Sequence, residues 1–355
     1  MEALFKKVSA LSATLILFLL TGIFVVLFIY AKPAIKEYGL HFLVDPRWGV
    51  EVSQNQNSVN NTANTSNQVA TLQDSPQIVD SDTIDSDDDA IDTDNDLAAD
   101  EDNDIAVNDD DIAAATTDTD IGSSTSNIKV VYGGLIPIVG TVLSTILAMA
   151  FAVPIAMGIA VFLSEIAPPF ISKPVGIAIE LLAAIPSIIY GMWGLFYFGP
   201  LVSSIFGGGS VSLLVAGMVL AVMIIPFMAS LTRDSMNTTP NVLKESAYAM
   251  GATKFEVIKD VIFPYAKKGI IGSMILALGR ALGETMAVAF VIGGVFNFPH
   301  KLTDPTVSIP VVLANNFAES SGMSLHALFY LALILFVISF MVISFAKFYF
   351  LRDKE

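Results

Sequence analysis

The stretch Glu245–Pro264 reads ESAYAMGATKFEVIKDVIFP and lies in a polar loop between two long apolar segments. The residues 241–250 favour a helix, and Gly251 can end it because glycine adopts a positive φ at low cost. Thr253, followed by Glu256 three residues later, has the pattern of a capping box at the start of a second helix. The stretch therefore predicts two short helices that meet at Gly251.

The second of these predicted helices has an apolar stripe and is expected to end at Pro264, because proline cannot continue a helix. An apolar stripe in an exposed loop needs a cover. Three surfaces could bury this stripe: the lipid surface, the protein's own spans, or another subunit. The stripe consists of Val257, Ile258, Val261 and Ile262, which repeat at helical spacing.

The composition places this loop in a membrane protein. Of the 355 residues, 54% are hydrophobic and 15% are charged, whereas about a quarter of a soluble chain is charged. A bilayer core needs roughly 20 apolar residues in a helix. Six segments qualify, so the expected fold is all-α and polytopic with about six transmembrane helices. They are Ser9–Tyr30, Gly134–Leu163, Val175–Phe198, Val211–Ser230, Gly269–Val295 and Leu325–Phe345.

Three of these segments contain a proline, at Pro154, Pro186 and Pro226. Proline is tolerated within a membrane helix where neighbours satisfy the freed backbone groups, so each segment is expected to cross as one span. The first segment could instead be a signal peptide. Its apolar run of 22 residues is too long for a typical signal sequence and is followed by no clean cleavage site, which favours a membrane anchor.

The distribution of Lys and Arg predicts the orientation of the spans. If the N-terminus is cytoplasmic, twelve Lys and Arg residues fall on the cytoplasmic side and five fall outside. Both termini are therefore expected in the cytoplasm. The loop 231–268 then faces the cytoplasm, and the connection 33–130 faces outside.

The connection 33–130 contains an acidic tract, residues 51–127, with 20 Asp or Glu and no Lys or Arg; the rest of the chain has a net charge of +4. The tract lacks aromatic residues and cannot build a core, so we expect it to be disordered. Asp92–Asp96 is similar to part of a calcium-binding loop. An EF-hand would need Gly and Glu where Leu97 and Asn103 stand, which favours a solvated tether, and no metal ligand set is expected.

Two charged residues lie inside the fifth apolar segment, in Gly279-Arg280-Ala-Leu-Gly283-Glu284-Thr285. Arg280 falls near the bilayer midplane, where an Arg is costly unless it faces protein or water. Glu284 comes four residues later and can pair with it across one helical turn. The pair could fix helix packing, or it could line an anion path, because a guanidinium fork suits oxyanion oxygens.

The loop resembles the coupling loop of bacterial ABC-importer permeases. Glu245, Ala247, Gly251, Ile258 and Pro264 match its spaced positions, and Ser246 stands where that family has Ala. The resemblance implies a type I importer permease fold, a coupling role for these five residues, and docking to an ATPase subunit. The chain has no Gly-x4-Gly-Lys-Ser/Thr phosphate loop. ATP is therefore expected on a partner, and the chain is expected to be a transport subunit without a cofactor rather than an enzyme.

The segment 279–288 is similar to the PstC-type permease of the bacterial phosphate importer, and so is the segment 180–194, which holds Tyr190-Gly-Met-Trp-Gly194. This resemblance implies a multi-pass protein of the bacterial inner membrane with a first helix in 1–32 and a five-helix core in 131–350. It also implies a translocation path at Arg280 and Glu284. The implied partners are a PstA-type second permease, two ATPase subunits, an external phosphate-binding protein and membrane lipid, with no nucleic acid. Permeation of sulfate or molybdate and ion-coupled secondary transport of an anion remain alternatives.

Overall fold

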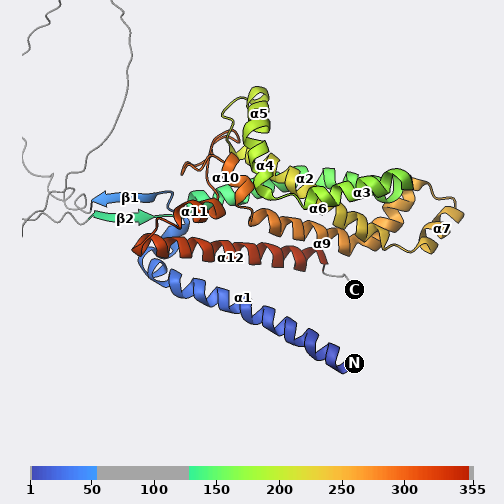
Figure 1. Cartoon of the computed structure of the whole chain (residues 1–355), viewed down its shortest axis with the longest axis horizontal. Helices are drawn as coiled ribbons and strands as arrows, with labels where there is room; N and C mark the ends of the chain where they lie inside the picture. Colours follow the sequence, from blue (N-terminus) through green and yellow to red (C-terminus); the bar gives the residue numbers. More distant parts are fainter. Residues whose placement is uncertain (1, 54–127, 352–355) are drawn as a thin grey trace, which may run out of the picture. The chain divides into compact units, whose positions relative to one another are not determined.

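The computed structural model describes residues 2–53 and 128–351. The predictions of disorder and of a calcium loop in the acidic tract concern residues outside these ranges. Most of the described chain is helical, and it contains one pair of strands (Figure 1). The helices are α1 Glu2–Tyr38, α2 Leu135–Val161, α3 Pro169–Ala183, α4 Ser187–Trp193, α5 Gly199–Phe206, α6 Leu213–Asn237, α7 Asn241–Ala249, α8 Lys254–Glu256, α9 Phe263–Leu282, α10 Met286–Val291, α11 Ile309–Asn316 and α12 Gly322–Leu351.

Six helical stretches are long and apolar enough to cross a membrane, which confirms the expected polytopic all-α fold. Three of them include π-helical turns that continue an α-helix: 162–166 after α2, 194–198 between α4 and α5, and 257–262 between α8 and α9. The six stretches are Phe5–Leu43, Leu135–Ile166, Ser187–Phe206, Leu213–Asn237, Lys254–Leu282 and Gly322–Tyr349.

The third predicted span, Val175–Phe198, is wrong in its bounds because the chain breaks at Pro186. Helix α3 ends at Ala183, α4 begins at Ser187, and Pro186 has an extended ψ of 135°. Proline has no amide hydrogen and disfavours a helical conformation in the residue before it. The carbonyl of Leu182, at the break, accepts from the amide of Ile185 at 3.2 Å and from the hydroxyl of Tyr190 at 2.9 Å. The structure moves the span to Ser187–Phe206.

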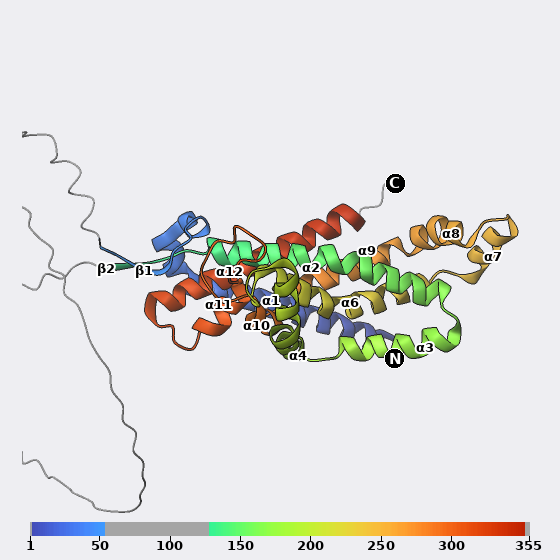
Figure 2. The same ribbon diagram turned by 90° about the horizontal axis from the view of Figure 1, so that it is seen from above.

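Helix α6 lies at the centre of the bundle and packs against α2, α3, α9 and α10 (Figures 1 and 2). Every fourth residue of α2 is small and buried, a spacing that lets helix backbones approach closely. Leu147 of α2 in turn lies over Gly217 of α6, where a Cβ would come within 2.5 Å of its side chain. The small residues are Gly140, Ser144, Ala148, Ala152, Ala156 and Ala160.

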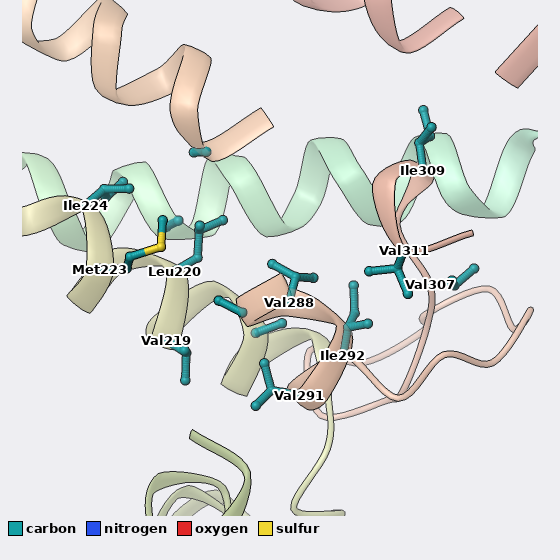
Figure 3. Close-up of a cluster of buried hydrophobic side chains, with 14 of the residues drawn as sticks. Val219, Leu220, Met223, Ile224, Val288, Val291, Ile292, Val307, Ile309 and Val311 are labelled. Atoms are coloured by element: carbon teal, nitrogen blue, oxygen red, sulfur yellow. The ribbon is translucent and has the colours of Figure 1, made fainter. Parts of the chain in front are cut away.

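Buried aliphatic side chains fill the space between α6, α10 and the start of α11 (Figure 3). Val219 and Met223 come from α6, whereas Val288 and Ile292 come from α10 and the residue after it. The core thus holds the short helix α10 against the central helix α6.

Helix α1 packs along α12. The rings of Tyr30 and Phe329 stack with centroids 4.8 Å apart, and the Nδ1 of His326 lies 2.8 Å from the carbonyl oxygen of Tyr30. The start of α1, the end of α12 and α7 lie at one end of the bundle (Figures 1 and 2).

The strands β1 (Trp48–Ser53) and β2 (Ile128–Tyr132) lie at the other end of the bundle and run antiparallel (Figure 1). Trp48 stacks on Phe296 with centroids 5.4 Å apart, and the Tyr38 hydroxyl donates to the carbonyl of Val130 at 3.0 Å. The distribution of Lys and Arg predicts that the end with the strands is outside and that the end with α7 is in the cytoplasm. This orientation stays a prediction.

Candidate functional site

The two helices predicted around Gly251 are present as α7 and α8. Gly251 has a φ of 89°, and its amide donates to the carbonyl of Tyr248 at 2.9 Å. The capping box is confirmed: a carboxylate oxygen of Glu256 accepts from the amide of Thr253 at 2.7 Å, and the Thr253 hydroxyl accepts from the amide of Glu256 at 3.4 Å. Local sequence therefore determines this turn.

The prediction that the second helix ends at Pro264 is wrong. Helix α8 continues through the π-helical segment 257–262 into α9, so that Lys254–Leu282 is one helical stretch. Pro264 lies in the first turn of α9. The π-helical turn shifts the hydrogen-bonding pattern just before Pro264, where the missing amide hydrogen is then tolerated. Helix α7 is thereby joined through one glycine turn to a long membrane helix.

The predicted apolar stripe is buried by the protein's own helices, which is one of the three alternatives that the sequence left open. Val257, Ile258 and Ile262 are buried with Ala160 of α2 and Met236 of α6. The apolar side chains that remain exposed in this loop are different ones, and the sequence reasoning missed them. They are Val242, Leu243, Tyr248, Met250, Phe255 and Tyr265, of which Met250 is 84% and Phe255 71% exposed.

The five predicted coupling residues divide into two groups. Ala247 and Ile258 are buried and join the same apolar cluster, so they hold α7 against the start of the long helix. Glu245, Gly251 and Pro264 lie on the surface. The structure thus brings two of the five together as packing residues and leaves the other three accessible.

Arg280 lies in the last turn of α9, half-buried. It comes 12 residues after Lys268, about 18 Å along a helix, which is a little more than half of a bilayer core of about 30 Å. Its Cζ lies 5.4 Å from the ring centroid of Phe227 on α6, a cation–π contact. Tyr190 on α4 lies within electrostatic range of it. Among the described residues no carboxylate forms an ion pair with Arg280.

The pairing of Glu284 with Arg280 across a helical turn is not present, because the helix stops between them. Helix α9 ends at Leu282, and Gly283 has a ψ of 0°. One carboxylate oxygen of Glu284 accepts from the amide of Ala287 at 3.1 Å, so Glu284 caps the start of α10. The fifth predicted span, Gly269–Val295, accordingly lies too far toward the C-terminus, because the spanning stretch is Lys254–Leu282.

Glycines position the helices around Arg280. A Cβ on Gly191 would lie 3.0 Å from the backbone of Ala287, and one on Gly194 would lie 2.7 Å from Val219, so α4 approaches α10 and α6 closely. A Cβ on Gly279 would lie 3.2 Å from Ile343 of α12, as expected of a small residue at a helix contact, whereas Gly283 faces no neighbouring helix. Close packing at Gly191 and Gly194 thus holds α4 and the turn after it against α10 and α6.

Comparison with known proteins identifies the family of the chain. Residues 137–352 match the family described as "Binding-protein-dependent transport system inner membrane component". The chain is 49% identical over 244 residues to the phosphate transport system permease protein PstC of Pasteurella multocida, covering 63% of this chain and 76% of that protein. It is 48% identical over 236 residues to the PstC protein of Haemophilus influenzae, covering 61% and 75%.

A structural similarity is found to the inward-facing MetNI methionine ABC transporter, with a TM-score of 0.48 and 21% identity, over 59% of this chain and 90% of that chain.

Proposed function

The chain belongs to the family of binding-protein-dependent transport system inner membrane components, and on that premise we propose that it is the PstC-type permease subunit of an ATP-driven phosphate importer. The observation that carries the proposal is the identity of 49% with a phosphate transport permease, over 76% of that protein's length. The family match over residues 137–352 includes both the loop around Gly251 and the helices around Arg280.

Arg280 is the residue that offers positive charge to the substrate. Its cation–π contact with Phe227 leaves the guanidinium without a carboxylate partner among the described residues. A half-buried Arg in that state attracts a tetrahedral oxyanion, which accepts hydrogen bonds from its fork of N–H groups. Glu284 acts on the path through the backbone, because it caps α10 and fixes the break beside Arg280.

Helix α7 is the element that docks to an ATPase subunit. It carries Glu245 and the exposed apolar Tyr248, and the following turn carries Met250. An exposed apolar patch with a polar rim is typical of a protein–protein contact. The ATP is bound by that separate subunit. A PstA-type permease completes the path, an external phosphate-binding protein delivers the substrate, and both termini lie in the cytoplasm.

Two alternatives from the sequence are less well supported. The family is defined by transport that depends on a binding protein, whereas an ion-coupled secondary transporter needs neither that protein nor a docking loop. A sulfate or molybdate permease would share the Arg–Gly–Glu pattern, but the two relatives reported above, matched over 76% and 75% of their length, are phosphate permeases.

The experiment that tests the function is uptake of labelled phosphate in cells without other phosphate importers, with the chain expressed beside its partner subunits. Uptake should persist when the proton gradient is dissipated and stop when ATP is depleted. Sulfate and molybdate in excess should leave it unchanged. Uptake that follows the proton gradient while ATP remains would show a secondary transporter instead.

A further inference from the structure

A largely buried ion pair joins α7 to the end of α2. The Nζ of Lys244 lies 2.6 Å from a carboxylate oxygen of Glu165, and their side chains are 17% and 9% exposed. Glu165 belongs to the π-helical segment 162–166, which continues α2. The two residues are 79 positions apart in the sequence. This contact was not predicted, because nothing in either segment indicates the other.

Lys244 lies on the inner face of α7. Ala247, three residues further, is buried on the same face, whereas Val242, Glu245 and Tyr248 are exposed. A partner that docks on the exposed face therefore reaches the rest of the protein through Ala247 and Lys244. The contact of Ala247 is apolar and non-directional, so it can slide. The contact of Lys244 is a short charge-assisted hydrogen bond, which fixes both distance and direction.

Glu165 lies at a corner where several helices are tied together. The hydroxyl of neighbouring Ser164 donates to the side-chain oxygen of Asn237, at the end of α6, at 2.9 Å. The hydroxyl of Ser172 on α3 donates to the carbonyl of Leu163 at 2.6 Å. From this corner α2 runs the length of the bundle beside α6 (Figure 2). A displacement of Glu165 is thus a displacement of the end of α2.

We propose that Glu165 is a positioning residue of the transport cycle, which couples α7 to α2 through Lys244. The proposal rests on the proposed function, in which an ATPase moves α7. An ion pair resists both pulling and pushing, so α2 follows α7 in both directions of the cycle. A buried pair of this kind adds little to stability compared with apolar packing, which fits a role in geometry rather than in folding.

The test uses the complete complex, purified and reconstituted in vesicles, with the phosphate-binding protein on the external side of the permease. The quantity measured is the number of phosphate ions transported per ATP hydrolysed. Glu165→Gln and Lys244→Met should each lower this ratio by at least about fivefold, the lower end of coupling effects between linked sites. The exchanged pair Glu165→Lys with Lys244→Glu should restore it to within about twofold. The ATPase subunit should remain bound to all variants.

Lys173→Met is the matched control, because Lys173 is exposed on α3 at the same end of the bundle and loses the same charge. Its ratio should equal that of the wild type. Glu165→Asp keeps the charge but shortens the side chain, so it should give an intermediate ratio and serves where a neutral variant fails to fold.

Three results would overturn the proposal: unchanged ratios in the single variants, a lowered ratio that the exchanged pair does not recover, or loss of the ATPase subunit from the single variants. The last would show that the pair serves docking. A wild-type complex that hydrolyses ATP but moves no phosphate would instead contradict the proposed function.

Discussion

The guanidinium of Arg280 faces the ring of Phe227, with Cζ 5.4 Å from the ring centroid. Glu284, the carboxylate nearest in sequence, is directed to the amide of Ala287 instead. The positive charge is therefore held by a neutral ring and is available to an anion. Arg280, Phe227, Glu284 and Ala287 thus have different roles in this arrangement. Single substitutions can therefore test these roles one at a time.

Replacing Arg280 by Gln should lower phosphate uptake by about tenfold or more, because each hydrogen bond to a charged group contributes about 1.5–3 kcal/mol. Arg280→Lys keeps the charge but loses the fork, so its uptake should fall between Gln and wild type. Initial uptake rates check this, with co-purification of the ATPase subunit as the control for assembly. If Arg280→Gln takes up phosphate at the wild-type rate, Arg280 is not part of the translocation path.

Gly251→Val should impair coupling without unfolding the bundle. The φ of 89° strains any residue with a Cβ, at a cost of about 1–2 kcal/mol, yet no atom lies within 4 Å of the added Cβ. Helix α7 should change direction, and uptake should fall by about fivefold to thirtyfold, as expected for about 1–2 kcal/mol. Gly272→Ala is the control, since Gly272 also faces open space but lies inside α9 with ordinary helical φ. Equal uptake by both variants would contradict the role of this turn.

Met250→Asp and Phe255→Asp should release the ATPase subunit. Both side chains are largely exposed, so neither change disturbs the core, but a charge placed in an apolar contact can weaken binding by about 2 kcal/mol or more. The fraction of ATPase that co-purifies with the chain measures this. Leu40→Asp, an equally exposed apolar residue at the opposite end of the bundle, should leave that fraction unchanged. If all three variants retain the ATPase, it docks elsewhere.

Ala152→Leu should destabilise the bundle. Ala152 is fully buried in the row of small residues on α2, and adding side-chain volume to a packed contact costs about 1–3 kcal/mol. The thermal unfolding temperature of the purified protein in detergent should fall by several degrees. Ile155 lies on the exposed side of the same helix, so Ile155→Leu should unfold at the same temperature as the wild type. A larger loss for Ile155→Leu would place the contact surface of α2 on the other face.

Deletion of residues 54–127 with a short Gly/Ser turn in their place should preserve uptake to within about twofold, because the free energy of closing a loop depends only weakly on its length. The strands β1 and β2 already hold the two ends of this segment side by side, and Trp48 anchors them on Phe296. Uptake rates with saturating and with limiting phosphate check this. A loss confined to limiting phosphate would assign the segment to capture of the substrate.

Features set by local sequence could be predicted. The turn at Gly251, the capping box at Thr253 and the number of spans all follow from short patterns, and the structure confirms them. Tertiary contacts decide the rest. Pro154 and Pro226 lie inside continuous helices whereas Pro186 breaks one, although the residue is the same. The helix break that redirects Glu284 depends likewise on α10 packing into the core, which no spacing within the segment reveals.

The packing of α1 on α12 has a consequence for how the protein is made. Tyr30 and Phe329 are about 300 residues apart, and at about 5–20 residues per second the ribosome needs about 15–60 s to reach the second after the first. During that time α1 is in the bilayer without the helix that it finally contacts. Its segment Ser9–Tyr30 contains no charged residue, so α1 is stable in the bilayer before α12 is synthesised. The contact between α1 and α12 is therefore among the last to form in the bundle.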